Sequence, residues 1–187
     1  MVKKKTCVFI SGKGSNLKNL IDRSRDKNFP INVSLVITNN EKAEGINYAK
    51  MFKIPYIFID TKITNHENKI LSNLKKYKIS FICLAGYMKI ISNYLIKNYK
   101  KKIINIHPSL LPKFKGLNTF SRILKNKEKK TGCTVHFVNE KLDDGNVIIQ
   151  KKFFINKNDN ENILKEKTQE LEYKAYPEAI IKIFRKN

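Results

Sequence analysis

Asn105 and His107 are separated by one residue at the end of an apolar run, just before a loop that contains two prolines. If this run is a β-strand, both side chains point to one face, while Ile106 points to the other. A carboxamide and an imidazole on one face, at the carboxyl end of a strand, could together polarise a carbonyl group. An isolated histidine is more often structural, so the spacing alone leaves both interpretations open.

An acidic pair, Asp143 and Asp144, lies in the segment EKLDDGN between two β-like runs. A solvated turn is the ordinary interpretation of Asp-Gly. A carboxylate beside His107 would instead raise the imidazole pKa and keep the ring protonated near neutral pH. The spacing does not show whether the two groups meet. For His136, in TVHFV, a structural role is the favoured interpretation.

A glycine-rich turn, ISGKGSNL, follows the first apolar run. Gly12 and Gly14 would let backbone N–H groups approach an anion, and Ser15 and Asn16 offer polar contacts or a helix cap. The spacing fits neither G-x-G-x-x-G nor the Walker pattern, so a dinucleotide or nucleoside triphosphate site is not indicated. A phosphate site and a plain tight turn remain equally good interpretations.

Short β-rich runs alternate with longer amphipathic segments along the first two thirds of the chain. The expected strands cover 7–11, 33–38, 56–60, 81–86 and 102–106, and the expected helices cover 16–25, 43–52, 67–77, 92–99 and 119–126. Strands that are apolar on both faces and joined by helices predict a twisted, mostly parallel sheet with helices on both faces. In such α/β sheets, ligands bind beyond the carboxyl ends of the strands.

The last third of the chain has a different pattern. Two β-like runs, 133–139 and 147–155, are joined by a short connection, which predicts antiparallel pairing and a mixed sheet. A long helix is expected from about residue 160 to residue 184, bent near Pro177. We expect one compact domain over residues 1–187, since no shift in composition marks a linker.

The composition limits the possible classes of protein. No apolar run approaches the roughly 18 residues of a membrane span, and the N-terminal run is too short for a signal-peptide core, so we expect a cytoplasmic protein with no membrane partner. Cys7, Cys83 and Cys133 are widely spaced, which favours buried core thiols over disulfides. No cluster of metal-ligand type occurs, so no metal is expected.

The formal net charge of +22 could indicate a polyanion partner. However, only four of the 38 basic residues are arginines, and the lysines are dispersed without interleaved aromatic residues. Abundant Lys, Asn and Ile fit an A/T-rich coding bias on a tolerant surface. We therefore expect no nucleic-acid partner, while a basic nucleic-acid-binding module remains the alternative from a different class.

Four motifs in order, SGKGSNL, LAGYMKIIS, NIHPSLLPKFKG and VHFVNEKLDDGNVIIQ, resemble the phosphoribosylglycinamide formyltransferase family over nearly the whole chain. The resemblance implies a Rossmann-like formyltransferase fold with antiparallel C-terminal strands. It also implies transfer of the formyl group of 10-formyltetrahydrofolate to the amine of N1-(5-phosphoribosyl)glycinamide, in purine (IMP) biosynthesis. Small-molecule substrates and a monomer or weak homodimer are expected.

The resemblance also implies the site residues. Asn105, His107 and Asp143 match the catalytic set, since Leu142 and Gly145 fix Asp143 as the match. Donors on Asn105 and on a protonated His107 would stabilise the oxyanion of a tetrahedral intermediate, and Asp143 would help to remove the amine proton. The implied substrate contacts are Gly14, Ser15, Asn16 and Glu172, and the implied cofactor contacts are Met88, Lys89, Ile90, Ile91 and Asn105.

Several positions depart from the family pattern. Lys115 replaces a usual proline, and Asp144 stands where a small residue is usual. Three further departures are Asn118, Phe120 and Tyr173, each at a position where the family often has histidine. An arginine that commonly contacts the folate tail has no clear match. The family's second proline typically follows a cis bond, so Leu111–Pro112 is predicted to be cis.

Other folate-dependent enzymes are the nearest alternatives. Methionyl-tRNA formyltransferase normally carries a second, C-terminal domain and lacks the GSN loop. Formyltetrahydrofolate hydrolase normally has an N-terminal regulatory domain. The presence of the loop and the length of 187 residues favour the glycinamide ribonucleotide branch.

Overall fold

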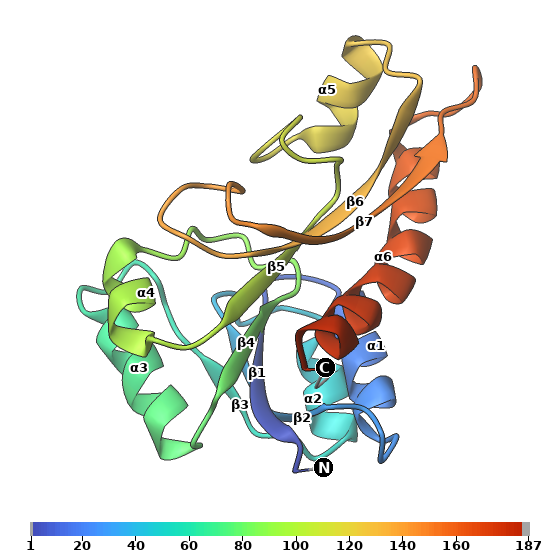
Figure 1. The fold of residues 1–187 in the computed structure, drawn as a ribbon. Coiled ribbons are helices and arrows are strands. Elements are labelled where there is room, and N and C mark those ends of the chain that lie inside the picture. The colour runs from blue at the N-terminus through green and yellow to red at the C-terminus, as the bar shows by residue number, and fades with distance from the viewer. Residues whose placement is uncertain (1, 185–187) are drawn as a thin grey trace. The chain divides into compact units, whose positions relative to one another are not determined.

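The computed structural model describes residues 2–184. Its strands are β1 (Lys4–Ile10), β2 (Ile31–Thr38), β3 (Tyr56–Phe58), β4 (Phe81–Leu84), β5 (Ile103–His107), β6 (Lys130–Phe137) and β7 (Val147–Phe154). Its helices are α1 (Ser15–Ser24), α2 (Ile46–Met51), α3 (His66–Lys76), α4 (Asn93–Tyr99), α5 (Thr119–Lys125) and α6 (Glu161–Phe184). Over the described part, the strands form one seven-stranded sheet in the order β3-β2-β1-β4-β5-β6-β7 (Figure 1).

The fold is the α/β, Rossmann-like arrangement that the sequence predicts, with an antiparallel pair at its C-terminal side. Chain contacts divide it into two compact units, Met1–Ile104 and Asn105–Asn187, and the boundary falls inside β5. This division does not test the expectation of one domain over residues 1–187, which stays a prediction.

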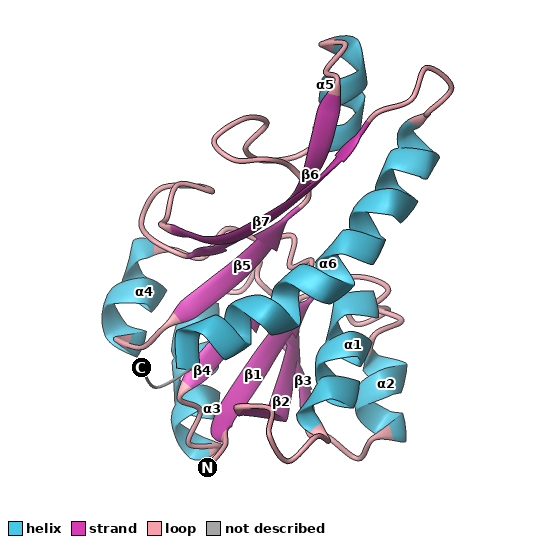
Figure 2. Ribbon diagram, turned by 45° about the vertical axis from the view of Figure 1, so that its right-hand side comes forward, coloured by secondary structure: helices cyan, strands magenta, loops and turns pink. Residues whose placement is uncertain are grey.

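The first unit is a doubly wound layer. β1 pairs in parallel with β2 and with β4, and β2 pairs in parallel with β3. The side chains of residues 7–10 on β1 have no exposed surface, as expected for a strand covered on both sides. Figures 1 and 2 show α1 and α2 on one face of this sheet and α3 and α4 on the other.

The second unit contains the antiparallel pair. β6 and β7 pair along their whole length, with a bulge between Val135 and His136. The predicted long helix is present as α6, with Pro177 inside it, and it packs against β6 and β7 (Figure 2). Elements begin and end within three residues of their expected bounds, the largest differences being the starts of β1, α2 and β6.

Two sequence-based expectations about particular residues, the state of the cysteines and one cis bond, can be compared directly. Cys7, Cys83 and Cys133 are free and buried, and burial raises the pKa of the Cys133 thiol to about 12, so it is a poor nucleophile. The Leu111–Pro112 bond is cis, as predicted. Among the described residues, no helix is long and apolar enough to cross a membrane, and no group of three or more His, Cys, Asp or Glu side chains could hold a metal ion.

Candidate active site

A polar cluster in the second unit joins Asn105, His107, His136 and Asp143. Asp143 Oδ2 lies 3.3 Å from His107 Nδ1, and Asp143 Oδ1 accepts a hydrogen bond from Asn105 Nδ2 at 3.4 Å. His136 Nε2 lies 3.6 Å from Asp143 Oδ1 and 3.3 Å from Asn105 Nδ2. The side chains of His107 and Asp143 are each only 7% exposed. The three residues of the implied catalytic set therefore meet in one buried cluster.

Local backbone geometry brings these side chains together. Asn105 and His107 share a face of β5, as the alternation of a strand requires. The bulge before His136 lies next to the cluster, and bulges commonly re-aim a side chain near an active site. Asp143 has a left-handed backbone, with φ of 48°, in the turn that follows β6.

Gly145 allows this turn to close tightly. A Cβ atom at Gly145 would lie 1.8 Å from the carbonyl oxygen of Phe137, at the end of β6. The backbone N–H of Phe137 also donates to the carbonyl of Asn146 at 3.0 Å. The glycine of the LDDG motif is thus required by close backbone approach, which fixes the distance between Asp143 and the end of β6.

The loop between β5 and α5 supplies two backbone groups to the cluster. The Phe114 carbonyl accepts a hydrogen bond from His107 Nε2 at 2.9 Å, and the Gly116 N–H donates to Asp143 Oδ2 at 2.9 Å. The first part of the loop is anchored on β6, because Thr134 Oγ1 donates to the Ser109 carbonyl at 2.6 Å and accepts from the Leu111 N–H at 3.1 Å.

The protonation of the cluster follows from its burial and contacts. Burial lowers the pKa of His107 below its ordinary value of 6.5, although Asp143 and the Phe114 carbonyl act in the opposite direction. For Asp143, burial raises the pKa, but the contacts from His136, the Gly116 N–H and His107 outweigh it and bring the pKa below 3.8. The expectation that Asp143 keeps His107 charged is therefore wrong for the site as it stands, because burial of the imidazole has the larger effect.

The hydrogen bonds define which protons are present. A carbonyl only accepts, so Nε2 of a neutral His107 carries the proton that Phe114 accepts. The carboxylate of Asp143 also only accepts, which assigns the amino group of Asn105 to the side that faces it. Protonation of His107 at Nδ1 would add a charge-assisted hydrogen bond to Asp143. The cluster can thus stabilise developing negative charge and accept a proton.

The first unit holds the other predicted contacts. Gly14 is the N-cap residue of α1, with φ of 73°, so Ser15 and Asn16 occupy the first turn instead of capping the helix. A Cβ atom on Gly14 would lie 2.5 Å from the Cα of Gly45, whose N–H donates to the Gly12 carbonyl at 3.0 Å. The turn is therefore packed against the start of α2, and its N–H groups lie at a helix N-terminus, where anions bind favourably.

Ser11 links this turn to the segment predicted to contact the cofactor. The Ser11 hydroxyl accepts a hydrogen bond from the Met88 N–H at 2.7 Å and donates to Asn39 Oδ1 at 2.5 Å. Met88 and Ile90 are 68% and 67% exposed, whereas Ile91 is buried. Lys89 is also exposed, so three of the four predicted cofactor residues present their side chains on the surface.

Glu172 lies on α6 in the second unit. Its charge contributes, after burial, to the raised pKa of Cys133 on β6. Tyr173 follows it on the same helix.

Three contributions to the cluster were not predicted from the sequence. His136 was interpreted as structural, yet it lies beside Asn105 and Asp143. The one feature of the sequence that could have indicated a place for His136 in the cluster was a polar ring within an apolar strand. The Phe114 carbonyl and the Gly116 N–H are backbone groups, and residue types carry no signal for them.

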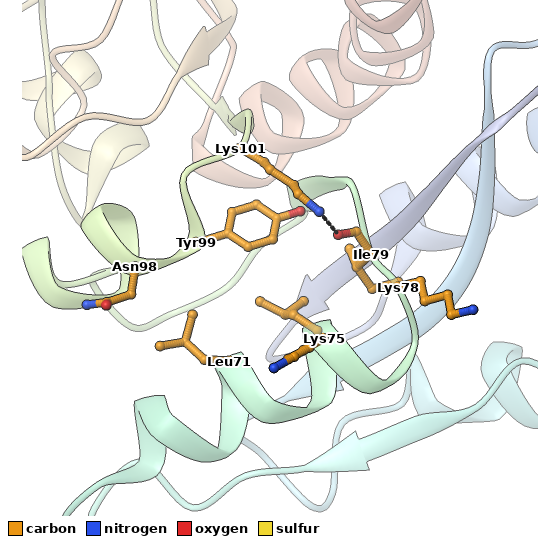
Figure 3. Close-up of a pocket in the computed structure, with 8 residues that line it drawn as sticks. Leu71, Lys75, Lys78, Ile79, Asn98, Tyr99 and Lys101 are labelled. Atoms are coloured by element: carbon orange, nitrogen blue, oxygen red, sulfur yellow. Dashed lines mark hydrogen bonds between the residues drawn. The ribbon is translucent and has the colours of Figure 1, made fainter.

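A groove of about 540 Å³ lies elsewhere in the first unit (Figure 3). Its lysines, Lys75, Lys78 and Lys101, lie at or just beyond the C-terminal ends of α3 and α4, and Lys101 Nζ donates to the Ile79 carbonyl at 3.1 Å. Positive side chains are stabilised at helix C-termini, so local structure explains them without a ligand.

A Rossmann-like sheet that brings together a half-buried carboxamide and a buried imidazole from β5 and a carboxylate from the turn after β6 defines an enzyme suited to acyl transfer. The formyl transferase family matches residues 4–180, and the chain belongs to this family.

Curated relatives and solved structures agree with this assignment. The chain is 39% identical over 185 residues to the phosphoribosylglycinamide formyltransferase of Haemophilus influenzae, covering 97% of this chain and 87% of the relative. It is 36% identical to the enzyme of the same name from Bacillus subtilis, covering 95% and 93%. The crystal structure of phosphoribosylglycinamide formyltransferase from Bacillus halodurans superposes with a TM-score of 0.94 at 34% identity, covering 98% and 96%.

Proposed function

We propose that the chain transfers the formyl group of 10-formyltetrahydrofolate to the amine of N1-(5-phosphoribosyl)glycinamide, a step of purine biosynthesis. The observation that carries this proposal is the position of Asp143, whose two carboxylate oxygens contact His107 and Asn105 in a buried cluster. The similarity to enzymes with this name over nearly the whole chain supports the choice of substrates.

The reaction requires three properties of a site. The amine forms a bond to the formyl carbon, and the electrons of the carbonyl π bond move onto its oxygen. The bond between the formyl carbon and the folate nitrogen then breaks, the amine proton is lost, and the leaving nitrogen gains a proton. The site must therefore stabilise an oxyanion, accept a proton and exclude competing water.

The residues of the cluster have matching roles in this proposal. Asn105 and His107 stabilise the oxyanion, and Asp143 accepts the amine proton directly or through water. His107 is neutral before the reaction, because burial lowers its pKa. A negative oxygen that forms beside the ring raises that pKa and favours the protonated form, so the charge on His107 appears when it is needed.

The proposal also assigns the substrate contacts, most of them to residues of the first unit. The turn Gly14, Ser15 and Asn16 holds the ribose phosphate through N–H groups at the start of α1. Residues 88–91 lie along the folate head, where Met88 and Ile90 provide exposed apolar surface. Glu172 is proposed to contact the glycinamide portion, and Asn105 also contacts the cofactor. No metal is required by any step.

The decisive experiment is a formyl-transfer assay with the purified protein, 10-formyltetrahydrofolate and N1-(5-phosphoribosyl)glycinamide. We expect formylated product in equal amount to the tetrahydrofolate released. Release of tetrahydrofolate without a formylated amine would identify a hydrolase, and transfer only to methionyl-tRNA would identify a different acceptor; either result would overturn the proposal.

Three properties of the whole protein belong to the same proposal. We propose a cytoplasmic monomer or weak homodimer that acts on small molecules without a nucleic-acid or membrane partner. Light scattering after size-exclusion chromatography, at concentrations from about 1 to 100 μM, would measure the molecular mass and show whether a weak dimer forms.

A further inference from the structure

We propose that Lys115, Arg122 and Asp144 form a clasp that positions His107 and Asp143 for the reaction. The inference rests on the proposed function, since it concerns the geometry of the same catalytic cluster. The three clasp residues act through others and are positioning residues.

The first half of the clasp is an ion pair between the two loops that meet at the cluster. Lys115 Nζ forms a salt bridge with Asp144 Oδ1, and the next residue along each loop completes the contact, because the Gly116 N–H donates to Asp143 Oδ2 at 2.9 Å. Lys115 and Gly116, adjacent in one loop, thus contact Asp144 and Asp143, adjacent in the other. A movement of Asp144 away from Lys115 also moves Asp143 away from Gly116.

The second half of the clasp is Arg122 on α5. Its Nη1 donates to the carbonyl of Lys115 at 2.6 Å and to the carbonyl of Leu117 at 3.3 Å. The guanidinium also lies 5.6 Å from the centre of the Phe114 ring. One arginine therefore contacts the residues on both sides of Gly116 and covers the residue whose carbonyl receives the His107 proton.

The first of these loops needs an external hold because its backbone is strained at Phe114. Phe114, Asn118 and Asp143 have left-handed backbones, with φ of 58°, 54° and 48°. Asn and Asp adopt this conformation readily, but for Phe114 it is unfavourable and persists only when surrounding contacts fix it. Phe114 and Asp143 are also the residues that contact His107. Loss of the clasp should therefore displace the catalytic groups before it unfolds the protein.

The ion pair has a matched control in the same loop. Lys113 Nζ forms a salt bridge with Glu128 at 2.8 Å, and neither side chain contacts His107 or Asp143 in the contacts observed. The side chains of Lys115 and Asp144 are 33% and 39% exposed. If this pair were an ordinary surface salt bridge, removal of either pair would have an equally small effect on kcat. The comparison of the two pairs therefore separates a positioning role from ordinary surface charge.

The experiment measures kcat, KM and the His107 imidazole titration by NMR in two double variants and in the matching single variants. For Lys115→Met with Asp144→Asn we expect kcat to fall by about 3- to 10-fold with KM nearly unchanged, and each single variant to show most of that loss, because contacting residues are not additive. Lys115→Arg should retain activity. The Lys113→Met and Glu128→Gln double variant should stay within about 1.5-fold of the wild type.

Arg122 is tested by a substitution that keeps the charge. Arg122→Lys retains the positive charge near His107 but cannot contact two carbonyls with the planar guanidinium. We expect kcat to fall by about 5- to 20-fold in this variant, with the melting temperature within about 3 °C of the wild type. A kcat equal to that of the wild type in Arg122→Lys would indicate that Arg122 acts only through its charge, which would overturn its role in the clasp.

The NMR titration keeps the proposal testable whatever the substrate. The Lys115→Met and Asp144→Asn double variant removes one charge of each sign, so a change in the His107 pKa reports on contact with Asp143. We expect this pKa to fall further, since the contact that raises it is loosened, while the Lys113 and Glu128 control leaves it unchanged. If the wild-type protein transfers no formyl group to the proposed amine, the proposed function fails, and the His107 titration in the double variant alone tests the clasp. In that case an unchanged His107 pKa would refute the clasp. If the wild-type protein is active, an unchanged kcat together with an unchanged His107 pKa would refute it.

Discussion

Asp143 has a contact for each of its acceptor positions, and this accounts for its place at the centre of the site. Oδ2 receives the Gly116 N–H and lies beside His107, while Oδ1 lies beside Asn105 and His136. A carboxylate that is buried with this many donors stays ionised, as the lowered pKa of Asp143 indicates. His107 differs because burial prevails over its contacts and lowers its pKa. The site thus combines a charged acceptor with a neutral imidazole.

Replacement of His107 by alanine should remove most of the activity. We expect kcat to fall by about 10²- to 10³-fold, the usual cost of one oxyanion donor, because Asn105 alone would remain to stabilise the intermediate. The thermal unfolding midpoint should change by only a few degrees, about the effect of 1 kcal/mol, since Asp143 keeps its contact with the Gly116 N–H. Near wild-type turnover in a well-folded variant would eliminate the proposed role.

His107 should also make stability depend on pH. Burial holds its pKa below 6.5 in the folded state, whereas the unfolded chain has a pKa near 6.5. Between these two values the unfolded state binds more protons, so lowering the pH favours unfolding. The contribution of His107 is therefore fully present above pH 6.5 and is lost as the pH falls through the folded-state pKa. Asp143 acts in the same direction, but only below pH 3.8.

The measurement is the free energy of unfolding by urea at pH values from about 7.5 to 5, for wild type and for His107→Asn. The wild type should lose stability toward the acidic end, and the variant should have a flatter profile. Parallel profiles would show that His107 titrates alike in the folded and unfolded states.

At the scale of elements, glycines set the distance between the turns that carry site residues. Gly145 brings the Asp143 turn against the end of β6, and Gly14 brings the β1–α1 turn against the start of α2. Both contacts join backbone to backbone, where no flexible side chain can yield. A larger residue at either glycine would push the two backbone segments apart, so these glycines determine how closely each turn packs.

Gly14→Ala and Gly12→Ala form an informative pair in one turn. A Cβ atom at Gly14 would lie 2.5 Å from the Gly45 Cα on a left-handed backbone, whereas one at Gly12 meets nothing within 4 Å. We expect Gly14→Ala to destabilise the protein by about 1–3 kcal/mol and Gly12→Ala by less than about 1 kcal/mol. Urea unfolding measures both values. Equal effects of the two substitutions would contradict the proposed packing of Gly14 on Gly45.

The kinetic consequence concerns the amine substrate. Displacement of the Gly14 turn should raise the KM for N1-(5-phosphoribosyl)glycinamide by about 10-fold while the KM for the formyl donor changes little, as expected when one charged hydrogen-bonding contact is lost. A matching rise in both KM values would instead indicate that the Ser11 hydrogen bond to the Met88 N–H transmits the change to the donor segment.

At the scale of the whole molecule, the sequence predicted elements better than contacts. The alternation of apolar runs and amphipathic segments located every strand and helix, because burial on both faces leaves a strong local signal. The antiparallel pair followed from a connection too short for a crossover. The meeting of His107 with Asp143 could be proposed only through resemblance, since 35 residues of chain lie between them and local patterns do not determine distant proximity.

The remaining features depend on three-dimensional packing. His136 lies beside Asn105 and Asp143 next to a bulge in β6, and the contributions of Phe114 and Gly116 come from backbone groups in a loop. The shift of the His107 pKa was predicted in the wrong direction, because the sequence indicated a carboxylate neighbour but not the degree of burial. Burial and backbone direction are properties of the folded chain and have no residue-type signature.

The net charge of +22 leads to a prediction about RNA. Lysines that are dispersed along the sequence, with few arginines and no interleaved aromatic residues, attract phosphates without reading bases, so binding should come from counterion release alone. We expect a 20-nucleotide RNA to bind at 50 mM salt and to lose at least about 100-fold in affinity at 200 mM salt, with a Kd weaker than about 1 μM. Filter binding at several salt concentrations and with two unrelated sequences measures this. Tight binding that resists salt or distinguishes the sequences would require stacking and base contacts, and would establish a nucleic-acid site alongside the catalytic cluster.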